Sequence, residues 1–331
     1  MFNKNVLRKG VIVAIIAQVF ILAFMAGKRE MIVATGKTLY LRSAPIDPRD
    51  PFRGDFVRLR YGINSIHQSQ YQGVRPFEEL NAGQVLYTAL KHGADDVYSF
   101  DYLTDQQPKN ATFIRARVNT TWSFMRSRNG FINLKYGIEQ YFVEQGKGKA
   151  MEDTLGTRDA LQIPVEMRLA VGGDGTAVIT DHRWSKLGIQ LAFIQPAPER
   201  RDPNDAIVSP IISITMQNVS QQPLTLAHLA DDCSFSLVHY NNSSYKENAD
   251  RGCTINTQLP DTTILQPDES KTIQIDFSET RWHVDTEGEH VETGSLLGWH
   301  QFRIVYTAPS VDGTWQGTMQ TPLFSGNGRV D

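Results

Sequence analysis

Charged side chains gather in two stretches of the chain, and their types allow either recognition or chemistry. The first stretch holds Arg49, Arg53 and Asp55 among prolines and a glycine, and the second holds Glu139 and Glu144. Carboxylates and arginines can form a polar recognition site, and carboxylates can bind a divalent cation. Aspartate beside proline or glycine also caps turns through the local backbone. We favour turn capping for the acids and expect Arg49 and Arg53 to contact a partner, so the five residues together form a hypothetical partner-binding site.

Catalysis would need a nucleophile and a base, and the sequence does not supply this pair. Ser43 precedes a Gly–Asp strand and a basic strand, an order that faintly resembles signal peptidases, but arginine stays protonated and cannot be their base. A hydrolase or carbohydrate-processing enzyme that uses Glu139 with Glu144 remains the alternative function. A deep cleft holding both would favour the enzyme, whereas turn-capping contacts would favour a binding protein. We predict no catalytic residue.

Histidines near acidic residues could indicate a metal site in the C-terminal half. The spacings of His283, His290 and His300 match no zinc motif, so we expect solvated loop residues and no metal. The sequence contains no phosphate-binding loop and no dinucleotide fingerprint, so no cofactor is predicted. Its net charge is −3 without a long block of like charge, which argues against nucleic acid as a partner.

Residues 11–26 form an apolar run without charge, which predicts a helix that contacts the lipid bilayer. Lys4, Arg8 and Lys9 precede it and favour a cytoplasmic N-terminus. A cleaved signal peptide is the alternative. Cleavage after Ala26 or Gly27 would leave Phe24 or Met25 at the third-last position, where a small residue is needed. We therefore predict an uncleaved anchor.

Period-two alternation dominates the region after the anchor and predicts half-buried strands. In residues 56–63, alternate positions are apolar and expected inside, with Arg58 and Arg60 outside. Residues 112–118 repeat the pattern, and residues 148–155 favour a short helix. Two apolar strands flank Gly172-Gly-Asp-Gly175, which predicts a hairpin because glycine tolerates positive φ.

The C-terminal part reads as short strands separated by turn residues, for example residues 211–218, 235–240, 271–277 and 299–306. This spacing is typical of an antiparallel sandwich, and the order resembles immunoglobulin-like domains of bacterial envelope proteins. The fold class expected is mainly β. The predicted domains are a stub and transmembrane anchor at 1–36, a β-rich domain at 37–186 and an immunoglobulin-like β-sandwich at 187–331.

Several blocks of the β-rich domain resemble the GDYXXLXY family of membrane-anchored bacterial proteins. Gly54-Asp-Phe-Val-Arg-Leu-Arg-Tyr61 is similar to the pattern that names the family, with Phe56 in place of a tyrosine. The segments 45–53, 136–148 and 172–175 also look like this family, and the likeness covers about Leu39 to Trp184. It implies an inner-membrane anchor, a β-rich domain outside and a multi-pass membrane protein as partner. The family's activity is uncharacterised.

Cys233 and Cys253 are the two cysteines of the chain. In an oxidising periplasm they could close one loop and stabilise the fold by about 3 kcal/mol, and two buried thiols are the alternative. Because the other features point outward, we favour the disulfide. The sequence thus predicts a non-enzymatic, single-pass protein of the bacterial inner membrane, with its bulk in the periplasm and a binding or scaffolding role.

Overall fold

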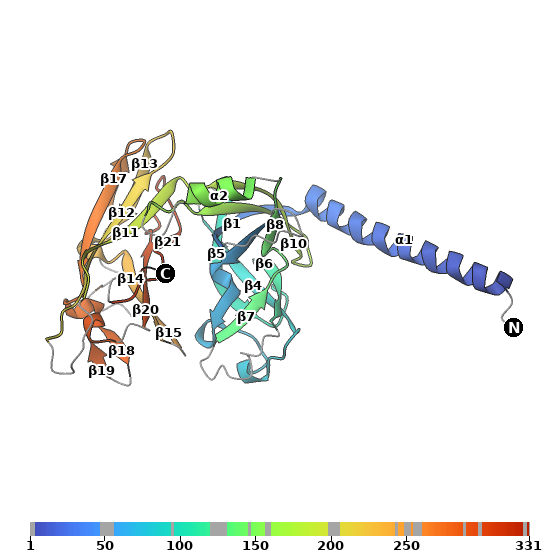
Figure 1. The fold of residues 1–331 in the computed structure, drawn as a ribbon, viewed down its shortest axis with the longest axis horizontal. Helices are drawn as coiled ribbons and strands as arrows, with labels where there is room; N and C mark the ends of the chain where they lie inside the picture. Colours follow the sequence, from blue (N-terminus) through green and yellow to red (C-terminus); the bar gives the residue numbers. More distant parts are fainter. Residues whose placement is uncertain are drawn as a thin grey trace.

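The computed structural model describes residues 4–46, 56–93, 96–119, 131–144, 147–155, 160–197, 206–241, 244–247, 253, 260–286, 289–296, 300–326 and 330. One long helix, α1 (Lys4–Thr35), projects from a body made of two β-rich parts that lie side by side (Figure 1). Residues Gly10–Thr35 of α1 are long and apolar enough to cross a membrane. This length and composition fit a membrane anchor or a signal sequence.

The part next to α1 is a β domain built on one large sheet. Its strands are β1 (Lys37–Ile46), β2 (Phe56–Tyr61), β3 (Ser65–His67), β4 (Val85–His92), β5 (Val97–Thr104), β6 (Thr112–Val118), β7 (Phe131–Lys135), β8 (Gln140–Phe142), β9 (Val165–Val171) and β10 (Ala177–Trp184). The order across the sheet is β10-β9-β1-β5-β4-β6-β7-β3, and β2 pairs with β1 and β8. Strand β1 runs parallel to β5 and antiparallel to β2 and β9. The short helix α2 (Lys147–Leu155) lies close to the predicted range.

Alternation correctly predicted which side chains of this domain are buried. Val57, Leu59 and Tyr61 on β2 are each 2% exposed, whereas Arg58 and Arg60 between them are exposed. On β6, Ile114, Ala116 and Val118 are buried in the same core. The predicted glycine hairpin is also present, since β9 and β10 pair antiparallel around Gly172–Gly175.

The second part consists of smaller antiparallel sheets around a core of its own. Its strands are β11 (Leu187–Gln195), β12 (Ile211–Asn218), β13 (Leu224–His228), β14 (Phe235–Asn241), β15 (Ser244–Glu247), β16 (Asp261–Leu265), β17 (Ser270–Asp276), β18 (Val284–Thr286), β19 (Glu289–Val291), β20 (Gln301–Thr307) and β21 (Thr318–Gln320). The sheets are β11-β12-β17, β13-β16, β15-β14-β20-β21 and β18-β19. The mainly β fold is as predicted, and immunoglobulin-like topology stays a prediction.

The two cores adjoin along the chain at Ser185 and Lys186. Trp184, the last residue of β10, packs against the first core, and Leu187, the first residue of β11, belongs to the second. The predicted disulfide is present in the second part, where Cys233 and Cys253 are bonded with their Cα atoms 5.6 Å apart.

His300 corrects one expectation, because it is buried and not a solvated loop residue. Its side chain is 6% exposed and that of His239 on β14 is 1% exposed. The two rings stack with centroids 4.9 Å apart, and Nε2 of His239 lies 2.7 Å from Nδ1 of His300. The ring of Phe302 also stacks on the ring of His239. The sequence around His300 did not indicate this histidine pair, because His239 lies on β14, 61 residues earlier in the chain.

Candidate functional site

The hypothetical partner-binding residues fall into two groups. Arg49, Arg53 and Asp55 lie outside the described residues, in the segment 47–55 between β1 and β2. Glu139 and Glu144 are described, and they have different surroundings. The described residues next to the segment, Ile46 and Phe56, end and begin paired strands, with Ile46 opposite Arg58.

Glu139 caps the turn that leads into β8. Its carboxylate accepts hydrogen bonds from the backbone N–H of Tyr136 at 2.6 Å and of Gly137 at 3.0 Å. Gly137 has a φ of 82°, which favours glycine at this turn. The backbone of Glu139 joins the turn to β2, since its carbonyl accepts from the N–H of Leu59 at 2.9 Å. These contacts are the turn-capping kind.

Two buried tyrosines connect this turn to the core through hydrogen bonds. The Tyr61 hydroxyl donates to the carbonyl of Ile138 at 3.0 Å, and the Tyr136 hydroxyl donates to the carbonyl of Ile63 at 2.7 Å. Burial raises the pKa of both phenols far above the usual value, and the nearby charge of Glu139 adds to this. Both side chains therefore stay neutral and act as hydrogen-bond donors.

Glu144 lies at the surface and pairs locally. Its Oε2 is 2.7 Å from Nζ of Lys147, three residues on, and both side chains are mostly exposed. The hydrogen bond from Lys147 lowers the pKa of the Glu144 carboxyl. Glu144 is thus an ordinary solvated carboxylate, and it pairs with a lysine rather than with Glu139.

A cluster of side chains around one buried carboxylate lies where the two β parts meet, and we call it the interdomain cluster: Arg42, Glu166, Arg183, Trp315 and Gln316. Glu166 on β9 is 4% exposed. Its two carboxylate oxygens accept from Nε of Arg42 on β1 at 3.0 Å and Nε of Arg183 on β10 at 2.7 Å. The three side chains face one another because Glu166 is the register partner of both arginines.

Arg42 continues from this cluster into the second part. Its guanidinium donates to the carbonyls of Thr318 at 3.1 Å and Gln316 at 3.3 Å, and it lies over the Trp315 ring. A cavity of about 50 Å³ remains between these side chains. That volume suits ordered water rather than a metabolite. The cluster therefore acts as a joint between the two parts.

A second joint holds the end of α1 against the β9–β10 hairpin. Ile32 is 5% exposed and packs with Ala170 and Val178. One helical turn or so earlier, Nζ of Lys28 lies 3.0 Å from Oδ2 of Asp174 in the hairpin turn. Partial burial alone raises the pKa of Asp174, but hydrogen bonds from Thr176 and Lys28 outweigh it and lower the pKa to about 2.

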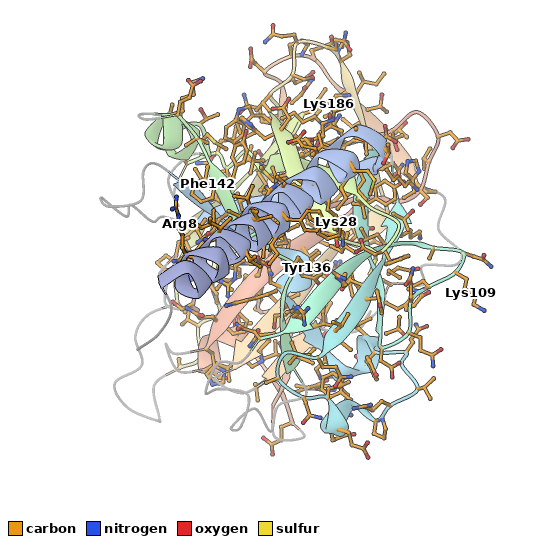
Figure 2. All side chains as sticks on the ribbon, turned by 90° about the vertical axis from the view of Figure 1, so that its right-hand side faces the viewer. Arg8, Lys28, Lys109, Tyr136, Phe142 and Lys186 are labelled. Carbon is orange, nitrogen blue, oxygen red and sulfur yellow. A yellow bond between two sulfur atoms is a disulfide. The ribbon has the colours of Figure 1, made fainter. Side chains whose placement is uncertain are left out.

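An open groove of about 370 Å³ lies beside this second joint. Its lining includes Lys37 of β1, Asn110 and the start of β6 at Thr112 and Phe113, and the hairpin glycines Gly172 and Gly173. Figure 2, seen from the side from which α1 projects, shows Lys28 beside the helix and Lys109 on an outlying loop. Among described residues, the linings of this groove and of the interdomain cavity include neither Glu139 nor Glu144.

Residues 18–181 match the profile of the GDYXXLXY protein family. These residues belong to the GDYXXLXY family. The match begins within α1 and ends within β10, so it contains both sides of the helix joint, Lys28 and Asp174. No curated protein matches the chain.

Within the GDYXXLXY domain, sequence reasoning missed the residues that make the two joints. Arg42 and Glu166 occupy polar positions on alternating strands, which the pattern assigns to solvent. Their burial depends on the second β part, which covers this end of the sheet. The feature of the sequence that could have indicated the interdomain cluster is the charge of three residues, Arg42, Glu166 and Arg183. They lie on β1, β9 and β10, which are neighbours in the folded sheet.

Proposed function

We propose that the protein is a single-pass, membrane-anchored envelope protein with a binding or scaffolding role toward a partner in the same membrane. The anchor is the uncleaved α1, with its N-terminus in the cytoplasm of a bacterium and the two β parts outside the inner membrane. Support for this orientation comes from Lys4, Arg8 and Lys9 ahead of the apolar run.

The joint between α1 and the hairpin is the observation that carries the proposal. The hairpin contacts the last turns of α1, which lie after the candidate cleavage positions Ala26 and Gly27. Here Ile32 is buried against Ala170 and Val178 of the hairpin strands, and Lys28 is paired with Asp174. Removal of the chain before Lys28 would leave Lys28 and Ile32 on residues 28–35 of α1, a remnant that is too short to be a stable helix by itself. The contacts therefore favour a helix that stays attached and holds the domain at the bilayer surface.

A partner in the membrane suits a domain held so close to it. The exposed apolar face of α1, for example Phe20 at 71% and Phe24 at 66%, can pack against lipid or another helix. Outside the bilayer, we keep Arg49 and Arg53 as the proposed contacts, with Asp55, Glu139 and Glu144 nearby in the matched family region. The capping contacts of Glu139 assign it a supporting role for this surface.

Membrane topology is tested by alkaline phosphatase fused after Asp331. An active fusion enzyme and an intact N-terminus are expected. Recovery of a soluble periplasmic form that starts near Lys28 would overturn the anchor. Partner binding is tested by affinity capture of the full chain from detergent-solubilised membranes.

The capture experiment compares the double variant Arg49→Ala, Arg53→Ala with Arg58→Ala, an exposed arginine on β2. The double variant should fold normally and lose a multi-pass membrane protein that the wild type and Arg58→Ala retain. Equal capture by all three proteins would remove the two arginines from the binding surface. Turnover of a defined substrate that these variants abolish would establish the enzyme alternative.

A further inference from the structure

The groove beside the helix joint lies where α1 leaves the β domain. Lys37, at its edge, is two residues beyond the end of α1, and Gly172 and Gly173 belong to the hairpin turn that contacts α1. A Cβ on Gly172 would lie 3.1 Å from Cγ1 of Ile32, so helix and groove wall are in direct contact. The position of the groove relative to a bilayer therefore follows from the position of α1.

The height of the groove can be estimated from helix geometry. Lys28 and Arg29 end the uncharged part of the helix, and Thr35 lies seven residues beyond Lys28. At 1.5 Å per residue this is a rise of about 10 Å. The headgroup layer adds about 5–7 Å to each side of the hydrocarbon core. The groove thus lies at the outer margin of the headgroups on the side of the bilayer where the domain sits.

Lys37 gives the groove a positive charge. Its ammonium is exposed, donates to Oγ1 of Thr112 at 2.7 Å and lies 5.2 Å from the centre of the Tyr98 ring. Within the described part of the chain, it has no carboxylate at ion-pair distance. The nearest acid of the hairpin, Asp174, is matched by Lys28 and by Arg115 at 3.6 Å. An ammonium with a neutral partner keeps donors for an anionic ligand.

We propose that this groove binds the headgroup of an anionic phospholipid from the adjoining leaflet. The phosphate oxygens accept hydrogen bonds from Lys37, Asn110 and Thr112, and Phe113 supplies an apolar wall for the glycerol. Lys109, which is exposed and directly precedes the lining residue Asn110, adds to the positive field around the opening. The inference rests on the proposed function, because it requires α1 to remain in the membrane.

The test is native mass spectrometry of the full chain in a nonionic detergent. The protein is titrated with dioleoylphosphatidylglycerol or, at equal concentration, dioleoylphosphatidylcholine. Wild type should retain phosphatidylglycerol preferentially. Lys37→Gln should lower the apparent affinity for it about fivefold, the effect expected of one cation near lipid phosphate. The matched control is Lys135→Gln, an exposed lysine on β7 outside the groove lining, which should behave as wild type.

Asn110→Ala is a second groove variant and covers the case in which Lys37→Gln does not fold. Equal retention of the two lipids by wild type, or the same loss in Lys37→Gln and Lys135→Gln, would overturn the proposal. So would unchanged affinity in both groove variants. Displacement of the lipid by millimolar inorganic phosphate would assign the groove to free phosphate instead.

The intact mass from the same spectra separates this failure from failure of the proposed function. A chain that begins at Met1 but shows no lipid preference overturns the groove alone. A chain that begins near Lys28 overturns the anchor and the groove together.

Discussion

Leu59 and Tyr61 occupy the positions of the leucine and final tyrosine in the family's name. Each side chain is 2% exposed, and Tyr61 also reaches the turn capped by Glu139 through its hydroxyl. At these two positions the residue type follows from packing and one buried hydrogen bond. The pattern therefore specifies how β2 joins the core and the turn before β8.

Leu59→Ala should lower the free energy of unfolding by about 2–5 kcal/mol, because it leaves a cavity under β2. Urea denaturation of the full chain in detergent micelles measures the change. Val74→Ala is the control, since Val74 is 77% exposed and its truncation should stay within about 0.5 kcal/mol of wild type. A similar effect of the two substitutions would show that Leu59 is not part of the core.

Two histidines, the buried His300 and the partly buried His228, make stability depend on pH. Burial lowers the pKa of His300, and burial together with Lys271 lowers the pKa of His228. The unfolded chain, with a histidine pKa of about 6.5, then binds protons that the folded chain excludes. Stability is therefore complete above about pH 6.5 and is lost as the pH falls toward the folded-state pKa values.

We expect the thermal midpoint of the full chain in detergent to fall between pH 7 and pH 5. His300→Gln removes one of the responsible groups and should make the fall shallower. A midpoint that is constant or rises on acidification would contradict this sign.

At the scale of elements, the end of α1 and the β9–β10 hairpin form one packed unit. Ile32→Ala removes the side chain that packs against Ala170 and Val178 and should destabilise this joint by about 2 kcal/mol. Hydrogen exchange measures the result as faster exchange in the hairpin. Its neighbour Met31 is 60% exposed, so Met31→Ala should leave hairpin exchange unchanged. Slow exchange in Ile32→Ala would mean that the sheet alone holds the hairpin.

The strands of the GDYXXLXY domain were predictable because each presents alternating apolar side chains to one core. The register between paired strands was harder to predict from the sequence, as the β9–β10 hairpin shows. Leu169 pairs with Ile179, but Arg168 pairs with Asp181, so Thr180 is an extra residue in the ladder. An unbroken register would have placed His182 opposite Glu166, and the bulge places Arg183 there instead. The alternation of apolar and polar residues along a strand does not reveal this shift in register.

Burial by segments that are distant in the chain could not be predicted from the sequence either. His300 is covered by His239 from another strand, and Glu166 is covered once the second β part packs against the sheet. Three of the five predicted contact residues, Arg49, Arg53 and Asp55, lie outside the described residues. Their role rests on the sequence and on the proposed capture experiment.

At the scale of the whole molecule, Arg42 connects the two β parts through Glu166 on one side and Trp315 on the other. Arg42→Ala should loosen this contact because it leaves Glu166 with one arginine fewer in a buried site. Spin labels on the two parts of the full chain should then report a broader distance distribution. Arg58→Ala, on the exposed face of β2, should keep the wild-type distribution. Unchanged distances in Arg42→Ala would place the rigidity of the joint elsewhere.

Strand β1 begins two residues after α1 and carries Arg42, so it links α1 to the interdomain cluster (Figure 1). It is paired with β9 over seven successive positions, from Lys37 to Ser43. If a partner pulled the second β part away from the bilayer, the force on β1 would act along the length of this strand. The ladder to β9 then resists in shear, with its hydrogen bonds strained together rather than opened one at a time. The fold gives this chain a mechanically strong path between α1 and the second β part.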